Sequence, residues 1–361
     1  MKIGILTFHR AVNYGALLQA YALYEFLEAS GHDVYMIDYR PVYITGRYRS
    51  YELIMPSGNL SLPLKLKYVL RSFMAVPSRS RRNLYFRQFV KRNFNLCRLD
   101  RHCKFDMVIA GSDQIWNPDK TDGIDPVYFG LETGPAYTVA YAASCGSADC
   151  IQPADMEERF FNCLSNVRRI SVREKSFADY IWKRTGRRAE VVADPVLLAG
   201  AEVFRKIAVR HKHPRPYLLL FQISLQPEAI RCAGKMAESM DLDLVCMTSS
   251  SVSLKDRAVI DSASPEEFIG YVMDASYVVT SSYHGTVFSV LFEKNFNMLS
   301  FDEKNSERMV QLLTLLGLER KMMYRYSDPD MSPVDYITVK RRADALVETS
   351  RRFLEDSMSV L

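Results

Sequence analysis

The sequence predicts an α/β protein made of two α/β domains. Short apolar runs alternate with segments of helical periodicity along the whole chain, and 361 residues suit about two domains of ordinary size. Hydrophobic residues make up 48% and charged residues 25%, as in soluble globular proteins. The longest apolar runs, such as residues 217–221, are far shorter than the ~18 residues of a membrane span. The apolar start is too short for a signal peptide and favours a first strand.

The first half begins with a strand–helix–strand unit, which favours a parallel sheet. Residues 2–8 form a short apolar run, residues 16–29 have helical periodicity up to Gly31, and residues 33–39 alternate like a strand. Further strands are expected over residues 105–110, 138–144, 169–172 and 190–193, with helices opening near Pro153 and Glu174. We place the N-terminal domain at residues 1–205.

A second series follows the linker-like residues 211–216. Strands are expected over residues 217–223, 242–247, 277–281 and 296–301, and helices over residues 227–240, 286–292 and 304–316. Ser264, Pro265 and Glu267 have the spacing of a helix start with a capping box. We place the C-terminal domain at residues 206–339 and a terminal charged helix at residues 340–361.

The net charge of +5 hides an uneven distribution. Residues 40–104 hold 15 Lys and Arg but only 2 Asp and Glu, a local charge of +13 that leaves the rest of the chain at −8. We call residues 40–104 the basic insert, and apolar spacing predicts two helices within it, around residues 66–73 and 86–90. Seven cysteines without CxxC spacing predict reduced thiols in a cytoplasmic protein, and neither a disulfide framework nor a metal site.

Ligands of open α/β sheets bind beyond the carboxyl ends of the strands, so the loops there are the first candidates for a site. The loop of residues 9–15 lacks the GxGxxG fingerprint, but Asn13 and Gly15 stand at a helix start, where N–H groups can bind an anion. Turn chemistry is the alternative interpretation of both residues.

The loop after residues 105–110 combines small, polar and aromatic residues. Asp113, Gln114 and Asn117 have side chains that can bind sugar hydroxyls, and Trp116 could serve as a stacking wall. The alternative is an Asx-rich loop with a core tryptophan.

Two strand ends carry charged residues. Arg173 follows residues 169–172, where its guanidinium can hold an anion through two hydrogen bonds, although pairing with Glu174 would be a structural explanation. Asp194, before Pro195, is interpreted as a cap of the next turn.

The most specific pattern lies between residues 277–281 and the apolar segment from residue 286. His284 stands beside the positive end of a helix dipole, Gly285 allows close backbone approach, and Ser281, Ser282 and Thr286 supply hydroxyls. This setting predicts a phosphate site with an acid/base above it. The sequence has no P-loop, GxSxG or HExxH motif.

These segments together resemble the polysaccharide pyruvyl transferase family. The resemblance rests on KIGILTFHRAVNYGALLQAYAL, GSDQIWNP after FDMVIA, SVRE, DPVLL and TSSYHGTVFSVLF, in order from about residue 2 to residue 301. It implies two Rossmann-like domains facing a cleft, in a GT-B-like arrangement. It also implies transfer of pyruvate from phosphoenolpyruvate onto two hydroxyls of a sugar in a surface-polysaccharide precursor, giving a ketal without a metal or organic cofactor.

The resemblance also suggests roles for the candidate residues. His284 would be the acid/base, Arg173 would hold the carboxylate, and the N–H groups around Gly285 and Thr286, with Ser281 and Ser282, would bind phosphate. The acceptor saccharide would be bound by residues of the first two loops, namely Asn13, Gly15, Asp113, Gln114, Trp116 and Asn117.

One position departs from the family pattern. Better-understood members carry an arginine two residues before the histidine, and this chain has Ser282 there. Either another cation such as Arg10 or Lys255 replaces it, or the donor is different. Two alternatives follow: a GT-B-type glycosyltransferase using a sugar nucleotide, and a non-catalytic saccharide-binding protein.

The basic insert allows two interpretations. Its helices could be ordinary elements with solvated basic faces, or they could contact an anionic membrane surface or a lipid-linked pyrophosphate acceptor. The second interpretation predicts a cytoplasmic protein, peripheral to the inner face of the membrane. Nucleic acid is not expected as a partner, because no recognised motif accompanies the charge.

Overall fold

The structure is a computed structural model, and it describes residues 1–48, 50, 61–99, 103–134, 136–147, 150–249, 259–301, 307–324 and 328–361. Lys255 lies outside the described residues.

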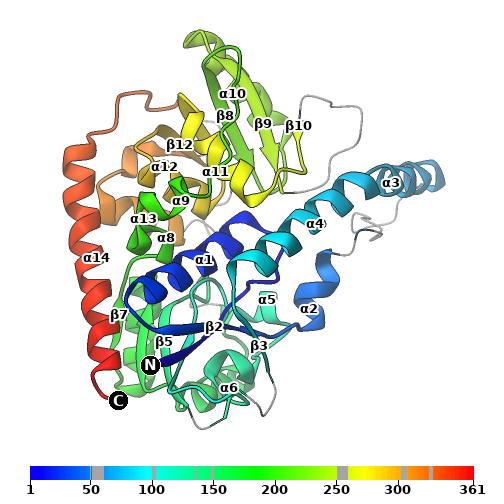
Figure 1. The fold of residues 1–361 in the computed structure, drawn as a ribbon. Helices are drawn as coiled ribbons and strands as arrows, with labels where there is room; N and C mark the ends of the chain where they lie inside the picture. The colour runs from blue at the N-terminus through cyan, green and yellow to red at the C-terminus, as the bar shows by residue number, and fades with distance from the viewer. Residues whose placement is uncertain are drawn as a thin grey trace.

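The first domain is built on a parallel sheet of seven strands in the order β3-β2-β1-β4-β5-β6-β7 (Figure 1). Its strands are β1 (Lys2–Leu6), β2 (Asp33–Asp38), β3 (Leu96–Arg98), β4 (Met107–Ala110), β5 (Tyr137–Ala143), β6 (Arg169–Val172) and β7 (Ala189–Val191). Its α-helices are α1 (Tyr14–Ala29), α2 (Val42–Thr45), α3 (Leu62–Met74), α4 (Val76–Asn93), α5 (Pro118–Thr121), α6 (Ala154–Leu164), α7 (Lys175–Thr185), α8 (Pro195–Ala199) and α9 (Ala201–Arg205).

The second domain has a parallel sheet of six strands in the order β10-β9-β8-β11-β12-β13. Its strands are β8 (Tyr217–Gln222), β9 (Asp243–Thr248), β10 (Val259–Ile260), β11 (Tyr277–Thr280), β12 (Asn295–Ser300) and β13 (Met322–Tyr324). Its α-helices are α10 (Pro227–Ser239), α11 (Pro265–Asp274), α12 (Tyr283–Leu291) and α13 (Glu307–Leu316), and α14 (Tyr336–Met358) ends the chain.

Both sheets have the doubly wound order of Rossmann-like domains, which confirms the predicted fold class in its GT-B-like arrangement. In each sheet the order reverses between the first strand and the fourth, at β1 and β4 in one domain and at β8 and β11 in the other. Such switch points are where ligands of open α/β sheets bind. The loops that follow β1, β4 and β11 are the ones that carry the candidate residues.

A single hydrophobic core joins the two domains. Helix α1 is buried on most of its surface because it lies between the first sheet, α4 and the second domain. Tyr14 of α1 stacks on Phe268 of α11 at 4.6 Å between ring centroids, and its hydroxyl donates to the Ala263 carbonyl. The far faces of the two sheets carry separate clusters.

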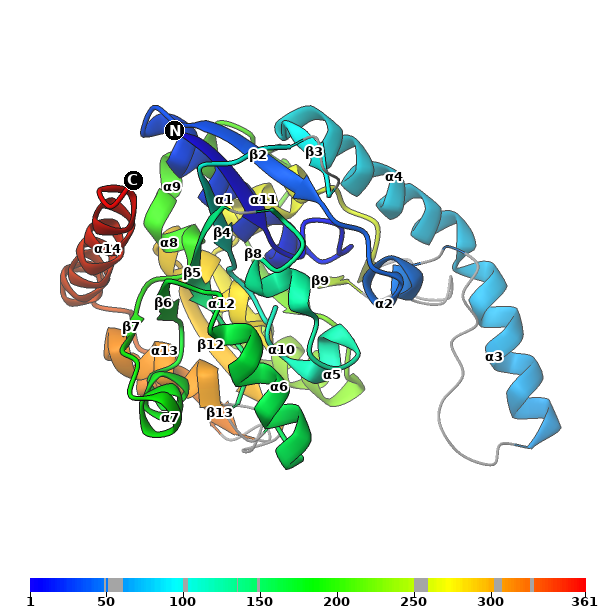
Figure 2. The ribbon, with the colours of Figure 1, turned by 90° about the horizontal axis from the view of Figure 1, so that it is seen from below.

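The basic insert does more than cover the first domain. Phe86 and Phe89 of α4 pack on α1, while Ser78 donates to an Asp261 carboxylate oxygen at 2.7 Å and Arg92 pairs with Glu266 of α11. Helix α4 therefore links both domains. Helix α3 continues beyond it and projects away from the body of the molecule (Figure 2).

Helix α14 returns from the second domain to the first, running along the side of both (Figure 1). Ser350 accepts a hydrogen bond from the Ala193 N–H, and Phe353 lies beside Tyr141 of β5. None of the described helices combines the length and apolarity needed to cross a bilayer.

Several sequence expectations need correction. Helices α1, α12 and α14 begin two to four residues earlier than expected, so His284 lies inside the first turn of α12. The short strands β3, β10 and β13 were not expected, because two or three residues give no periodicity. Cys97 and Cys103 form a disulfide, so the expectation of reduced thiols throughout is wrong for this pair. The capping box at Ser264 and Glu267 is confirmed.

Candidate active site at the domain interface

His284 lies where the two domains meet. It occupies the first turn of α12 and is largely buried, with 9% of its side chain exposed. An added Cβ at Gly15 would lie 2.2 Å from the His284 Nδ1, so the imidazole rests directly on the first turn of α1. Gly15 thus has a clear reason to be glycine. The sequence placed these residues on two separate loops, and the structure brings them into contact.

Asp194 holds the other side of the imidazole. Its Oδ2 lies 3.3 Å from the His284 Nε2, at ion-pair distance but without an aligned hydrogen bond, and its Oδ1 accepts from the Val196 N–H. The prediction that Asp194 caps the next turn is confirmed, and its contact with His284 is new. Although burial favours the neutral acid, His284 and Arg173 outweigh it and lower the pKa of Asp194 to about 2.

Arg173 completes this network from the end of β6. Its guanidinium lies 2.9 Å from Asp194 and 3.4 Å from Asp113, and it stacks 4.7 Å from the Tyr283 ring centroid. Burial opposes its charge, but Tyr283 and the acidic neighbours together raise the pKa of Arg173 above its ordinary value. The side chain is 2% exposed and already paired. Arg173 therefore positions Asp194 and Asp113 here, where the sequence predicted an open anion ligand.

Arg308, at the start of α13, is a second cation that the sequence analysis missed. Its guanidinium lies 5.6 Å from the centroid of the Tyr283 ring, which Arg173 also contacts. It also touches the side-chain amide of Gln114. Burial and the proximity of Arg173 lower the pKa of Arg308. A positive charge in the first turn of a helix is unfavourable, because the helix dipole is positive there. This unfavourable placement was the sequence signal that could have marked Arg308 as a functional residue.

Glu174 is buried beside the two arginines. Its Oε1 accepts from the Ser144 hydroxyl at 2.6 Å, and its Oε2 has no hydrogen-bond partner among the described residues. Burial raises the pKa of Glu174 despite the attraction of Arg173. A cavity of about 10 Å³ touches Glu174, Arg173 and Arg308, enough for about one water molecule.

The loop after β4 contributes polar groups in a strained backbone. Asp113 has φ of 74°, in the left-handed region, and its Oδ1 accepts from the Gln114 N–H. Asn117 caps α5, and its side-chain amide lies against the amide of Gln114. Asp113 and Gln114 thus face the arginines, while the Asn117 side chain is occupied by local structure.

Trp116 is not a stacking wall. Its side chain is in the core of the first domain, stacked on Phe129 at 5.2 Å with Phe160 and Phe177 at its edges, and its indole N–H donates to the Tyr128 carbonyl. A ring that is 1% exposed offers no face to a sugar, so the predicted acceptor contact is wrong and the core alternative is confirmed.

The serines and N–H groups before α12 mostly serve the helix itself. Ser282 caps α12, and its Oγ accepts from the Gly285 N–H at 3.3 Å while its carbonyl accepts from the Thr286 N–H. Ser281 accepts a long hydrogen bond from Gln222. Both N–H groups are therefore occupied within the helix start, and the phosphate site around Gly285 and Thr286 stays a prediction.

Asn13 likewise caps its helix, through a 3.2 Å hydrogen bond from the Ala16 N–H. Arg10 pairs with Asp38 at 2.7 Å and lines a different pocket, so it does not replace the family arginine near His284. Arg308 lies close to the position of the family arginine instead, because it contacts the ring of Tyr283, the residue after Ser282.

The arrangement defines the class of site. His284 can exchange a proton through Nδ1 while Asp194 steadies Nε2, and Arg308 adds a positive charge that has no ion pair among the described residues. A proton-transfer group beside cations, between two Rossmann-like domains, is typical of group-transfer enzymes.

The model of the polysaccharide pyruvyl transferase family matches residues 13–303. This chain therefore belongs to the polysaccharide pyruvyl transferase family, and the resemblance predicted from its motifs is confirmed. No relative is found among curated proteins.

Solved structures with a similar backbone include sugar-nucleotide enzymes. S. aureus MnaA in complex with UDP shares 12% identity at a TM-score of 0.46, over 99% of this chain and 90% of that one. The UDP-GlcNAc 2-epimerase of Methanocaldococcus jannaschii shares 9% sequence identity at a TM-score of 0.46, and the match covers 96% of this chain and 93% of that one. Arabidopsis thaliana UGT89C1 shares 11% sequence identity at a TM-score of 0.45, and the match covers 97% of this chain and 90% of that one.

Proposed function

We propose that this transferase moves the pyruvyl group of phosphoenolpyruvate onto two hydroxyls of a saccharide and releases phosphate. The observation that supports the proposal best is the His284–Asp194 pair with Arg173 and Arg308 beside it, at the domain interface of a chain in this family. The reaction needs a proton donor, a proton acceptor and cations, and these residues are of those kinds.

In the proposed reaction, C3 of the enol gains a proton and C2 becomes electrophilic. One sugar hydroxyl adds to C2 and loses its proton. A second hydroxyl then forms the other C–O bond and loses its proton as the bond from C2 to the phosphate oxygen breaks, and phosphate leaves with that electron pair. His284 passes protons in these steps, and Arg308 is the cation with fewer committed partners for the donor's negative charge. No metal or organic cofactor enters these steps.

The proposal is tested by incubating the full chain with phosphoenolpyruvate and a panel of saccharides. We expect phosphate release and a saccharide product whose mass has gained a pyruvyl ketal. Parallel incubations with sugar nucleotides test the glycosyltransferase alternative, and thermal stabilisation by each donor reports binding without turnover. Stabilisation and turnover with sugar nucleotides alone would contradict the proposal. Saccharide binding without turnover of any donor would support a binding protein instead.

A further inference from the structure

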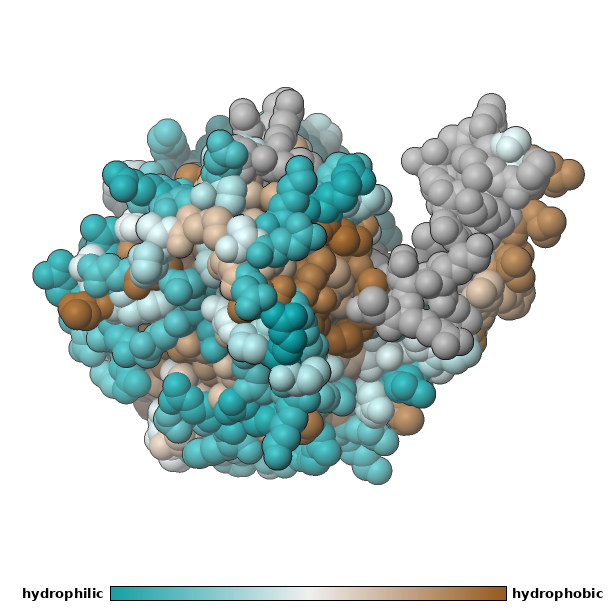
Figure 3. Space-filling view, turned by 90° about the horizontal axis from the view of Figure 1, so that it is seen from above, coloured by the Kyte–Doolittle hydropathy of each residue, from teal (hydrophilic) through white to brown (hydrophobic). Residues whose placement is uncertain are grey.

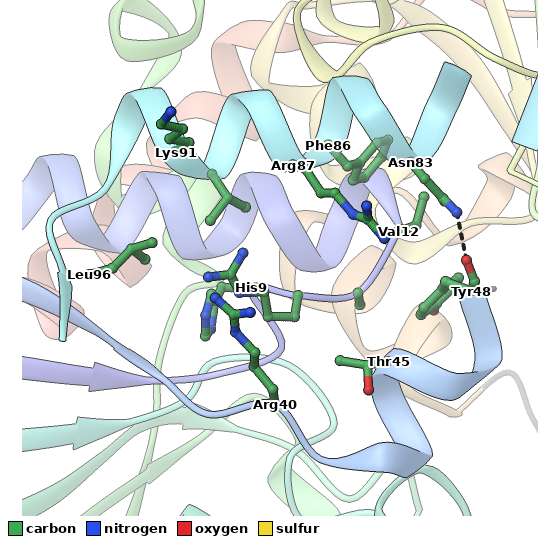
Figure 4. Close-up of a pocket in the computed structure, with 13 residues that line it drawn as sticks. His9, Val12, Arg40, Thr45, Tyr48, Asn83, Phe86, Arg87, Lys91 and Leu96 are labelled. Atoms are coloured by element: carbon green, nitrogen blue, oxygen red, sulfur yellow. Dashed lines mark hydrogen bonds between the residues drawn. The ribbon is translucent and has the colours of Figure 1, made fainter. Parts of the chain in front are cut away.

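A second site emerges in the first domain, outside the His284 network. A pocket of about 710 Å³ lies between the loop after β1, the end of β2 and helix α4 (Figure 4). It is formed at the carboxyl ends of two neighbouring parallel strands, where ligands of such sheets bind. In Figure 4, Arg87 descends from α4 and Arg40 rises from the opposite wall, with His9 beside Arg40.

The pocket is strongly basic. Arg10, Arg40, Arg87 and Lys91 line it, and none of the lining residues that the structure describes is Asp or Glu. Asp38 lies behind the wall and pairs with Arg10 at 2.7 Å and with Arg40 at 2.6 Å. One carboxylate thus balances one of four permanent positive charges, and about three remain for a ligand.

Three of these donors are available. In the described part of the chain, Arg87 and Lys91 have no ion pair or hydrogen bond, and the Nη2 of Arg10 is buried without a hydrogen-bond partner. Buried donors are normally satisfied, so an unsatisfied one that faces a basic cavity indicates a missing acceptor. Oxygen atoms of a phosphate or diphosphate group meet this need, because they carry several negative charges and accept from arginine through two hydrogen bonds.

The rest of the lining indicates an organic ligand. Val12, Phe86, Val90 and Leu96 form an apolar part of the wall. The same loop then links the pocket to the active site, because Gly15, which touches His284, follows Val12 by three residues, at most about 11 Å of chain.

We propose that this pocket binds a phosphate or diphosphate group carried by the acceptor saccharide and so places the sugar toward His284. The link to the acceptor rests on the proposed function, whereas the anion site itself does not. A phosphate ester fixed at this distance would lower the entropy cost of aligning the sugar hydroxyls.

Binding of inorganic pyrophosphate to the full chain, measured by calorimetry at low and high salt, tests the anion site without turnover. We expect the double variant Arg87→Gln/Lys91→Gln to bind at least tenfold more weakly. Arg81→Gln, which removes an exposed charge from the same helix but not from the pocket, should bind as the unmodified protein does. Unchanged affinity in the double variant, or no pyrophosphate binding at all, would overturn the site.

The role toward the acceptor has a separate readout. The double variant should raise the KM for a phosphorylated acceptor at least tenfold and leave the KM for the same saccharide without phosphate unchanged. Equal effects on both acceptors would overturn the acceptor role. Absence of any pyruvyl transfer in the unmodified protein would instead contradict the proposed function and leave the pyrophosphate result standing.

An independent observation concerns helix α3. Leu62, Leu66, Leu70 and Phe73 are spaced along one face of the helix and are 60–81% exposed. Figure 3 shows hydrophobic side chains along the outer edge of this projecting arm. Helix α3 itself contains three Lys and Arg and no Asp or Glu. An exposed apolar face within so basic a segment has the composition of a helix that lies in the surface of an anionic membrane.

We infer that α3 docks the protein on an anionic lipid surface. Co-sedimentation with vesicles of phosphatidylcholine containing 30% phosphatidylglycerol should retain the full chain, and binding should fall with salt and in pure phosphatidylcholine. Leu66→Gln/Leu70→Gln should reduce retention at least tenfold, while Trp182→Gln, an exposed aromatic of α7, should not. Equal binding to neutral vesicles, no binding, or a leucine-dependent dimer without vesicle binding would overturn this inference.

Discussion

At the scale of single residues, the candidate site depends on contacts that cross the two domains. His284 and Arg173 could be predicted as candidates because each comes shortly after a strand, among residues of suitable chemistry. Their connection through Asp194 could not, because local sequence explains Asp194 fully as a cap. Arg308 had no motif at all. Partners far apart in the chain are set by tertiary packing, which a single sequence does not display.

Gly15 gives the sharpest test of the contact between α1 and His284. Gly15→Ala should reduce pyruvyl transfer about a hundredfold, because the new methyl group would occupy the position of the imidazole. Helical Gly234→Ala, whose added carbon would make only an ordinary contact with Leu244 at 4.0 Å, should keep full activity. Steady-state kinetics with circular dichroism checks both. Full activity in Gly15→Ala would contradict the assigned position of His284.

Asp194 makes a prediction about pH. Its folded pKa is lowered to about 2, so its stabilising effect is fully present above about pH 4 and is lost as pH falls through about 2. Asp194→Asn keeps a capping side chain but should lower the free energy of unfolding by about 2 kcal/mol at neutral pH. Urea unfolding should show this difference shrinking below pH 4. A difference that stays constant down to pH 2 would refute the assignment, and exposed Asp241→Asn is the control.

At the scale of elements, the long periodic helices and buried strands were predictable, and the short edge strands were not. Trp116 shows why loop chemistry misleads: the residue lies in a polar loop, yet it packs among three phenylalanines of the first domain. The hydroxyls and N–H groups at the start of α12 have the sequence pattern of a phosphate site. In the structure they form the N-terminal cap of the helix, where the Gly285 N–H donates to the Ser282 Oγ. A cap and an anion site use the same residue types, so only geometry separates them.

The cap of α12 can be tested directly. Ser282→Ala should lower the free energy of unfolding by about 1 kcal/mol, because the Gly285 N–H loses its acceptor. Ser281→Ala removes only the 3.4 Å hydrogen bond from Gln222 and should cost less. Chemical denaturation of both variants measures this. Equal losses would show that Ser282 does not act as the cap.

At the scale of the whole molecule, two Rossmann-like domains were predictable from alternating patterns, but their shared core was not. Tyr14, Phe268 and Phe288 belong to one cluster that spans both domains. The basic insert, expected as a solvated face or a docking surface, also links the domains through α4. Which charged side chains turn inward depends on the partner domain, and composition alone gives no such information.

The shared core predicts that the domains unfold together. Calorimetry should show one cooperative transition for the unmodified protein. Tyr14→Ala should remove about 3–5 kcal/mol and split that transition, because it deletes the ring stacked on Phe268. Tyr128→Ala, in a cluster of the first domain alone, should destabilise without such a split. Two separate transitions in the unmodified protein would refute the claim of a common core.

The central claim is that His284, steadied by Asp194 at the domain interface, transfers protons in pyruvyl transfer. Its most direct test measures phosphate release from phosphoenolpyruvate with a ketal-forming saccharide, comparing the unmodified protein with His284→Gln and with the surface variant His213→Gln. We predict a loss of about 10²–10⁴-fold in kcat for His284→Gln, measured where circular dichroism shows that the variant is folded, and none for His213→Gln. Turnover by His284→Gln at the unmodified rate would contradict the account.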